Sequence, residues 1–565
     1  MDATVHCTAF SCPQERSPHS RRFEAEKLDQ FAKLDSPWNS RRQIARQIDV
    51  SDRTLYRWIE RSRNAVQASS WPGDVARLFQ SPDGLDFLHG LVTAAHLVFV
   101  QANDCGIRSL CWFLELSGLD EFVSPSFGAQ QAVAEEVESL LVTFGQEEDQ
   151  RLAASMPARE ISLCEDETFH HQICLVGIEP VSNFLLLEQY EPQRDATTWN
   201  RCLDERLSGL PITVFQVTSD QSKALIAHTQ SHLGAHHSPD LFHVQQDTVR
   251  ATSLALSSQT EAAIEELDKT RQKIADLRAQ HDACREQCPQ DPLVEELGRH
   301  VQQAEAEEAA AVERVTVCQA RQGRAKAARQ GLGQDYHPLD LATGQVVSAD
   351  ESAKRLTGHF DTLDQVAVEA GLSAHAREKL AKARRVLGAM QTTLVFFWTM
   401  IATRLEAWKV SPSAQLWMRE QLIPGYYLQR AAEKAGTAQE RQRLRALSEE
   451  VLARARSPDG LWGTLSPEVR TGLERRAQQC ADFFQRSSSC VEGRNGQLSL
   501  KHHALHYFTT RKLRALTVLH NYLLQREDGS TAAQRFYGTA PRDLFSWLRE
   551  HLSLPARPRR KRRAR

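Results

Sequence analysis

Three acidic residues lie where they could share divalent metal ions. Asp166 and Asp220 each follow an apolar run of the kind that forms a buried strand, and Glu492 lies in the first turn of a basic helix. Two Mg²⁺ ions roughly 3.5–4 Å apart can activate an oxygen nucleophile and stabilise the leaving oxygen when a phosphodiester bond breaks. Because Mg²⁺ prefers oxygen ligands and keeps several waters, a few carboxylates are enough. The three acids therefore form a candidate site for chemistry on a phosphodiester.

Each acid also has a purely structural interpretation. Asp220 is placed to cap a helix that begins at Gln221. Asp166 has an acidic residue on either side and could be a turn residue in an acidic patch. Ser489 and Glu492 have the spacing of a capping box. Taken singly, the structural interpretation is at least as good in each case. The metal hypothesis depends on all three acids falling at element junctions in a suitable order.

The apolar pattern around the first two acids predicts strands. Runs rich in β-branched and aromatic residues indicate five strands, at 161–164, 172–178, 184–190, 211–217 and 241–244. Helices are expected before and after the fourth strand, at 195–207 and from residue 221. Three consecutive strands followed by strands reached through helices predict a mixed α/β sheet. Asp166 and Asp220 would then end the first and fourth strands, and neighbouring strands lie about 4.8 Å apart.

From about residue 248 to residue 486 the sequence predicts only helices. Apolar residues recur there at the alternating steps of a coiled coil, at Val294, Leu297, Val301, Ala304, Ala311, Val315 and Cys318. Glu308 is the one seam position that carries a charge. The simplest arrangement is an antiparallel helical hairpin at about 258–330. If Glu492 belongs to the same site as Asp166, the helical block is an insertion within the α/β unit.

The N-terminal part of the chain contains a candidate DNA-binding motif. The first 25 residues are polar and are expected to be disordered. Residues 26–70 predict helices that share a small apolar core, with Ser51 as the cap of a helix at 52–61. A helix-turn-helix would place this helix in the major groove. The residues expected to contact DNA are Arg53, Thr54, Arg57 and Arg61. The alternative is an ordinary helical hairpin with a solvated basic face.

Charge and cysteine usage favour a nucleic-acid partner in the cytoplasm. The net charge is only −3, but seven arginines lie between residues 37 and 64, and the last nine residues carry seven positive charges. Such basic segments suit the phosphates of DNA. Twelve cysteines without a CxxC pair indicate reduced thiols. The N-terminus lacks a signal-peptide core and the most apolar run, 394–401, is too short for a bilayer, so no membrane partner is expected.

The chain resembles bacterial insertion-sequence transposases of the DDE type, which have an RNase H-like catalytic core. Five stretches of the α/β unit carry this resemblance, at 163–168, 194–199, 217–225, 238–243 and 488–495. Three C-terminal stretches add to it, at 519–522, 526–529 and 544–548. The resemblance implies a core made of 156–247 and 487–550, separated by an all-helical insertion at 248–486. A helical linker, or a second helix-turn-helix, would occupy 71–155, and a basic tail 551–565.

The family implies that Asp166, Asp220 and Glu492 bind two Mg²⁺ ions, with Mn²⁺ as a substitute, and catalyse strand cleavage and transfer at transposon ends. Its partners would be the element ends and target DNA, and a homodimer or larger oligomer is expected because two ends must be held together. The cytoplasmic location would be the bacterial nucleoid. Further DNA contacts are expected from the region after Glu492, at Arg494, Asn495, Lys501, Arg511 and Lys512.

Other functions remain open from the sequence. One is a domesticated, catalytically inactive DNA-binding protein that keeps the scaffold, and another is a coiled-coil assembly protein. Two histidine groups also suggest zinc, at His228, His232 and His236 and at His502, His503 and His506. Because neither group has a convincing fourth ligand, structural or phosphate-binding roles are favoured.

Overall fold

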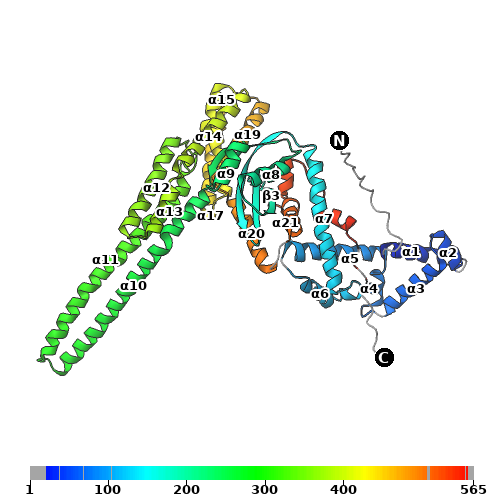
Figure 1. Ribbon diagram of the computed structural model, residues 1–565, viewed down its shortest axis with the longest axis horizontal. Coiled ribbons are helices and arrows are strands. Elements are labelled where there is room, and N and C mark those ends of the chain that lie inside the picture. The colour runs from blue at the N-terminus through cyan, green and yellow to red at the C-terminus, as the bar shows by residue number, and fades with distance from the viewer. Residues whose placement is uncertain are drawn as a thin grey trace.

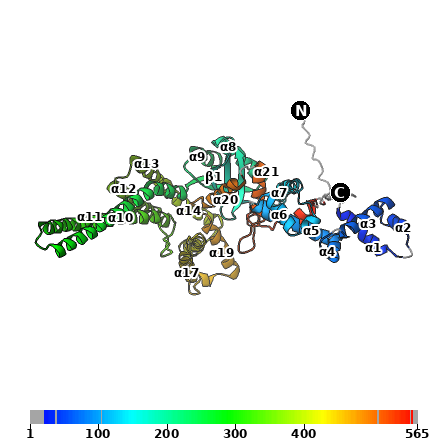
Figure 2. The same cartoon turned by 90° about the horizontal axis from the view of Figure 1, so that it is seen from below.

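The computed structural model describes residues 21–36, 39–67, 69–103, 105–505, 509–553, 555 and 557. The molecule is elongated and mostly helical, with a small β-sheet near its middle (Figure 1). The N-terminal helices and a long helical hairpin lie at opposite ends, as the perpendicular view also shows (Figure 2). Residues 1–20, for which disorder was expected, lie outside the described residues, and so does most of the basic tail at 551–565. Residues 21–25 were expected to be disordered as well, but they are helical.

The N-terminal unit has the predicted helical hairpin, preceded by one more helix. Its helices are α1 (Arg21–Leu34), α2 (Arg41–Gln47) and α3 (Asp52–Gln67). The buried residues that join them are Phe31, Ile44, Ala45, Ile48 and Leu55. The Ser51 hydroxyl accepts a hydrogen bond from the Thr54 N–H at 3.2 Å, so Ser51 caps α3 as predicted.

A helical connector leads from this unit to the sheet. It consists of α4 (Gly73–Leu78), α5 (Pro82–Ala95), the π-helical segment η1 (His96–Ala102), α6 (Ile107–Leu116), the 3₁₀ turn η2 (Leu119–Glu121) and α7 (Phe127–Ala153). Ser126 caps α7 by accepting a hydrogen bond from the Ala129 N–H. The 27 residues of α7 run alongside the sheet domain and contact its C-terminal helices.

The sheet is mixed, as predicted, and has five strands. They are β1 (Arg159–Phe169), β2 (Ile173–Glu179), β3 (Phe184–Glu191), β4 (Ile212–Ser219) and β5 (His236–Pro239). The order is β3-β2-β1-β4-β5, with β1, β2 and β3 antiparallel and with β4 and β5 parallel to β1. The fifth strand was expected at 241–244, which is wrong. Asp240 caps a helix that begins at Leu241, so the strand lies just before it.

Helices cover both faces of the sheet. On one face, α8 (Ala196–Leu207), α9 (Lys223–Ala227) and the π-helical segment η3 (His228–His232) pack against Leu175 and Leu187. On the other face lie α7 and the C-terminal helices, which bury Val176 and Ile178. These helices are α20 (Ser489–Leu505), α21 (Thr510–Tyr522), α22 (Ala532–Tyr537) and α23 (Leu544–His551).

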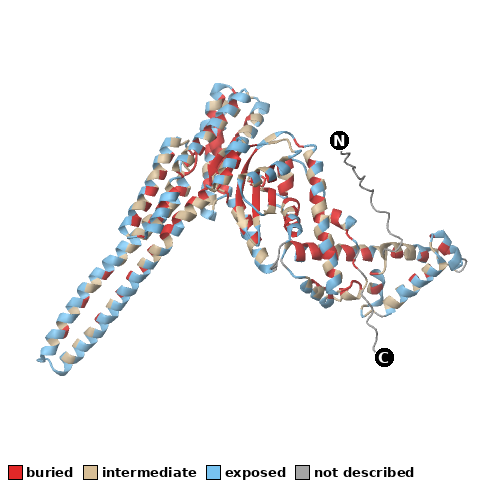
Figure 3. Ribbon diagram, viewed as in Figure 1, coloured by how far each residue is buried: buried red, intermediate tan, exposed pale blue. Residues whose placement is uncertain are grey.

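The helical block lies between β5 and α20. It starts with the hairpin of α10 (Leu241–Gln287) and α11 (Pro292–Asp335), which is longer than the predicted 258–330. The remaining helices are α12 (Ala349–Glu369), α13 (Ala374–Arg384), α14 (Leu387–Ala407), α15 (Pro412–Trp417), η4 (Met418–Leu422), α16 (Ile423–Glu433), α17 (Ala438–Ala455), α18 (Leu461–Thr464) and α19 (Pro467–Ala481). Figure 3 shows buried residues gathered where the hairpin meets these helices, and a largely exposed outer hairpin.

The hairpin has the predicted seam. Leu297, Ala304 and Ala311 are buried. Glu308, the charged seam position, accepts a hydrogen bond from Arg271 of α10 at 3.0 Å. The charge is therefore paired across the two helices at the edge of the seam, which explains how the hairpin tolerates it.

Two helical stretches, Pro82–Ala102 and Ala374–Ala407, are long and apolar enough to cross a membrane by length and composition alone. Leu88 of the first lies in a helical core with α1 and η2, and Leu394 and Phe397 of the second lie in the core of the insertion. Part of each stretch is thus packed inside the protein. The run at 394–401 forms part of a buried helix, as expected.

Candidate metal centre

The two ends of the insertion meet at Asp240. The Ser488 N–H donates to Asp240 Oδ1 at 2.9 Å, and the Ser488 hydroxyl donates to Asp240 Oδ2 at 2.6 Å. Next to this pair, the Leu241 N–H donates to the Arg486 carbonyl at 2.9 Å. Gln216 of β4 donates to the Gln485 carbonyl at 2.9 Å. The chain therefore leaves the sheet and returns to it at one place, and α20 starts beside the ends of β4 and β5.

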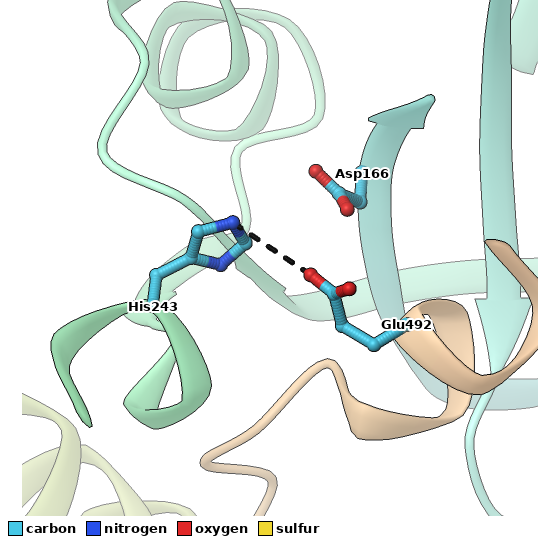
Figure 4. Close-up of side chains that lie close together, drawn as sticks. All are labelled: Asp166, His243 and Glu492. Carbon is cyan, nitrogen blue, oxygen red and sulfur yellow. Dashed lines mark ion pairs between the residues drawn. The ribbon is translucent and has the colours of Figure 1, made fainter. Parts of the chain in front are cut away.

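Three side chains from different elements converge there (Figure 4). Asp166 comes from β1, His243 from the first turn of α10 and Glu492 from the first turn of α20. One ligand atom from each lies within 4.8 Å of the others. His243 Nε2 is 3.7 Å from Glu492 Oε1. The sequence prediction that Asp166 and Glu492 meet despite the intervening insertion is confirmed.

The pleat of β1 selects Asp166 from three consecutive acids. Asp166 pairs with Val176 of β2, and it is on the sheet face covered by α20. Its neighbours face the other way, because side chains alternate along a strand. Glu167 accepts hydrogen bonds from Arg194 at 2.8 Å and from the Trp199 indole at 3.3 Å. Glu165 is fully buried, 3.5 Å from His228. Asp166 is thus the acid of this group that can reach Glu492.

Asp220 lies near the cluster and outside it. It directly follows β4, which runs parallel to β1 with Cys164 opposite Thr218. Its Oδ1 accepts a hydrogen bond from the Ser222 N–H at 2.8 Å, and Ser222 is the residue that caps α9. Helix capping by Asp220 itself, the structural alternative, is therefore wrong. The negative charge of Asp220 contributes to the electrostatics of Asp166.

Burial and nearby negative charges disfavour ionisation of the carboxyl groups in this cluster. Burial raises the pKa of Asp166 to about 7, and the charges of Glu492 and Asp220 act in the same direction. Burial also raises the pKa of Glu492, against the influence of His243. The hydrogen bond to Asp240 raises the pKa of His243 to about 9. His243 favours the ionised form of both carboxyl groups, and a divalent cation would stabilise these ionised forms further.

The residues after Glu492 have different roles from those predicted. Asn495 is 9% exposed and donates a hydrogen bond from Nδ2 to Asp166 Oδ2 at 3.1 Å. Arg494 is buried and donates to both carboxylate oxygens of Glu188, at 2.7 and 2.8 Å. The expectation that these two residues contact DNA is wrong for this structure. Asn495 orients Asp166, and Arg494 neutralises a buried acid of β3.

Three other cations expected to contact DNA make contacts within the protein. Lys512 is buried and donates to the Val100 carbonyl at 3.2 Å, and Lys501 donates to the Ala102 carbonyl at 2.8 Å. Both carbonyls lie in the last residues of η1, where helical carbonyl groups lack partners within the helix. Arg511 is exposed and lies 3.4 Å from Glu138 of α7. The two lysines thus tie α20 and α21 to η1. The expected DNA contact of Lys512 is wrong because its side chain is buried, whereas those of Lys501 and Arg511 stay predictions.

The predicted capping box at the start of α20 is absent. The N–H groups of Val491 and Glu492 both donate to the Ser488 carbonyl, so Ser488 precedes the helix and Ser489 is its first residue. The Ser488 hydroxyl is directed to Asp240. Glu492 is consequently not needed at the helix cap and points to Asp166 and His243.

The candidate DNA-binding face of α3 is partly available. Arg53 and Arg57 are exposed. Thr54 accepts a hydrogen bond from the Ser51 hydroxyl at 2.8 Å and belongs to the helix cap. Arg61 is paired with Glu24 of α1 at 3.0 Å. Arg53 and Arg57 are therefore the two predicted contacts whose side chains have no partner within the described residues.

The histidines considered as zinc ligands have structural partners. His228 bonds Asn200 at 2.7 Å, His232 bonds Asp204 at 2.9 Å and His236 bonds Thr393 at 3.1 Å. His502 stacks on His170, and His506 lies outside the described residues. Sequence reasoning missed a different histidine, His243. The available signal was an aspartate three residues earlier at a strand-to-helix junction.

Comparison with known proteins gives one partial match. A family described as "Family of unknown function (DUF6399)" matches residues 418–564. This span contains Glu492 and the C-terminal helices, and it begins after β1, β4 and the first turn of α10, so it does not include them. No curated protein and no solved structure matches the chain.

Proposed function

We propose that this protein is a DNA transposase of the DDE type, which cleaves and joins DNA strands with divalent cations in an RNase H-like core. The observation that carries the proposal is the convergence of Asp166 and Glu492, from opposite sides of the helical insertion, beside Asp220. Separate structural roles for the three acids, as helix caps or a turn residue, do not account for this convergence.

The sheet supports the same proposal. Three antiparallel strands followed by two parallel ones, in the order β3-β2-β1-β4-β5, is the arrangement expected of an RNase H-like core. In such a core the central strand and its parallel neighbour present acids at one edge. Asp166 of β1 and Asp220 after β4 occupy these positions.

The residues fit a divalent cation. Asp166 and Glu492 offer oxygen ligands in a cluster whose carboxyl groups resist ionisation without added positive charge. Asn495 donates a hydrogen bond to Asp166 Oδ2, which restricts the rotation of this carboxylate. When bound, divalent cations would activate the attacking oxygen and stabilise the leaving oxygen of the phosphodiester. The protein side chains would hold the cations in place and position the phosphodiester for attack.

DNA binding is assigned to the N-terminal unit. Arg53 and Arg57 on α3 are exposed and suit the phosphates or base edges of a major groove. Because two transposon ends must be brought together, the active form is proposed to be a homodimer or larger oligomer. The hairpin seam, which suggested an assembly protein, is occupied within the chain because α10 packs on α11.

The test is cleavage of DNA that carries the inverted repeats flanking the coding region, with Mg²⁺ or Mn²⁺. Wild-type protein should nick the repeat ends, and Asp166→Asn, Asp220→Asn and Glu492→Gln should each lower the rate at least about 100-fold. Glu313→Gln, an exposed acid on the hairpin, is the matched control and should cleave normally. Undiminished cleavage by the three variants would exclude this active site. Binding of the repeats without cleavage by wild type would instead support an inactive, transposase-derived DNA-binding protein.

A further inference from the structure

We propose that His243 is a third protein ligand of the cation at this site, that Asp240 orients it, and that the site consequently prefers Mn²⁺ to Mg²⁺. The inference rests on the proposed metal-dependent function. His243 and Asp240 have no role in the proposed triad of Asp166, Asp220 and Glu492. The inference follows from the hydrogen bonds of one buried carboxylate.

Asp240 is 2% exposed and accepts four hydrogen bonds. Its Oδ1 accepts from the N–H groups of Phe242 and Ser488, each at 2.9 Å. Its Oδ2 accepts from the Ser488 hydroxyl and from His243 Nδ1, each at 2.6 Å. Both lone pairs of each oxygen are therefore used, and the carboxylate has one defined orientation.

This arrangement fixes which nitrogen of His243 faces the site. A carboxylate only accepts hydrogen bonds, so Nδ1 carries the proton directed to Asp240. The other nitrogen, Nε2, lies 3.7 Å from Glu492 Oε1 and within the cluster that includes Asp166. An imidazole whose remote N–H is held by a carboxylate is the usual form of a metal-ligating histidine. Cation binding at Nε2 would release to solvent the proton that this atom carries when it is ion-paired with Glu492.

Asp240 also sets the distance between His243 and Glu492. It caps α10, which carries His243. It also binds Ser488, the residue directly before α20, and α20 carries Glu492. One carboxylate therefore fixes the first turns of both helices. Asp240 is a positioning residue, because it acts on the site through His243 and Ser488.

The donor set determines the expected cation preference. Mg²⁺ is bound almost entirely through oxygen ligands, whereas first-row transition ions accept an imidazole nitrogen together with carboxylates. Two carboxylates and one imidazole should therefore bind Mn²⁺ at least about 10-fold more tightly than Mg²⁺. Loss of the imidazole should remove most of this difference.

The isosteric variant Asp240→Asn separates orientation from folding. The amide oxygen of the new side chain can still accept from the N–H groups of Phe242 and Ser488. The cap of α10 and the hydrogen bond between the two ends of the insertion are therefore retained. Its NH₂ group would donate to His243 Nδ1, which moves the ring proton to Nε2 and removes the lone pair directed to the site. The matched control is Asp291→Asn, because Asp291 caps α11 through the Leu293 N–H and has no contact with the site.

The experiment measures Mn²⁺ and Mg²⁺ affinity of the full-length protein without DNA, by electron paramagnetic resonance of free Mn²⁺ and by titration calorimetry. We expect Asp240→Asn and His243→Gln to weaken Mn²⁺ binding about 10- to 100-fold, with a smaller effect on Mg²⁺. Asp291→Asn should bind both ions as wild type does. Circular dichroism checks that each variant is folded, and His243→Gln carries the test if Asp240→Asn does not fold.

The outcomes separate this inference from the proposed function. Equal Mn²⁺ affinity in wild type and His243→Gln would overturn the inference, and so would a wild type that binds the two ions equally tightly. Equal losses of Mn²⁺ and Mg²⁺ in His243→Gln would also overturn it, because the histidine would then act only through packing. If Mn²⁺ binding depends on His243 while no DNA is cleaved, the metal site stands and the transposase proposal fails.

Discussion

Asp240 and Ser488 are 248 residues apart in the chain and are joined by two hydrogen bonds. The helical insertion between them therefore begins and ends at one point of the sheet. Closing so long a loop has a modest entropic cost, since this cost grows only with the logarithm of loop length. The closure of the insertion by Asp240 and Ser488 allows Glu492 to meet Asp166.

The outer hairpin should be dispensable for the fold. Leu267, Ile274, Leu297, Ala304 and Ala311 are buried in the outer hairpin and belong to none of the larger domain cores. Removing residues 265–315 and joining Ile264 to Thr316 through a four-residue glycine-rich turn should leave the thermal midpoint of the remaining protein within a few degrees of wild type. Affinity for Mn²⁺ should also be unchanged. Loss of cooperative unfolding in this variant would mean that the outer hairpin supports the core.

The buried pair of Arg494 and Glu188 should be essential for stability. Arg494→Met leaves Glu188 charged and without its bidentate partner in a site where the two side chains are 4% and 0% exposed. Breaking such a pair costs roughly 3–5 kcal/mol of unfolding free energy. Urea unfolding should report this loss, and the double variant with Glu188→Gln should recover part of it. If Arg494→Met unfolds at the wild-type urea concentration, the pair is not structurally important.

Asn495 should affect the site more than the fold. Asn495→Ala removes the hydrogen bond to Asp166 Oδ2 and gives that carboxylate rotational freedom. We expect cation affinity to fall about 10-fold, since supporting residues of a metal site typically contribute 10- to 100-fold. Calorimetric titration with Mn²⁺ measures the effect. Asn200→Ala, on the opposite sheet face, is the comparison and should retain wild-type affinity.

Stability should decrease in mild acid because of His520. Its Nε2–H donates to the Asn183 carbonyl at 2.8 Å, and burial lowers its pKa to about 4 from the ordinary 6.5. Between these values the unfolded chain binds a proton that the folded protein does not. This contribution is therefore fully present above pH 6.5 and is lost as the pH falls toward 4. It amounts to at most about 3 kcal/mol.

The measurement compares unfolding free energies at pH 7.5 and pH 4.5. His520→Gln keeps a donor for Asn183 and should lose less stability over this range than wild type. His375→Gln, at an exposed site on α13, should follow the wild-type curve. An identical pH dependence in His520→Gln and wild type would contradict the assignment.

DNA binding should depend on α3. The double variant Arg53→Ala, Arg57→Ala removes two exposed cations and should weaken binding to the element ends. If both contact phosphates, the slope of log affinity against log salt should become less negative by about 2. The double variant Arg445→Ala, Arg454→Ala on α17 is the matched control for net charge. Equal affinities of the two double variants would exclude α3 as the DNA-binding element.

The local elements were largely predictable, whereas the partners of polar residues were not. The cap at Ser51, the seam of the hairpin and four of the five strands follow from spacing and side-chain type, which act over a few residues. The error at the fifth strand has the same origin, because a short apolar run fits a strand or the first turn of a helix equally well. Residues 241–244 form the first turn of a helix because Asp240 caps α10.

The sequence by itself determined the type of sheet, the helical insertion and the two acids Asp166 and Glu492. Tertiary structure alone decided the rest of the site. Arg494 and Lys512 look like surface cations, but Glu188 and the carbonyl of Val100 bind them in the interior. The role of His243 depends on Ser488 and Asp240 being brought together across the insertion. Periodicity encodes which face of an element is buried, but the partner of a charge depends on distant segments that only the folded chain brings into contact.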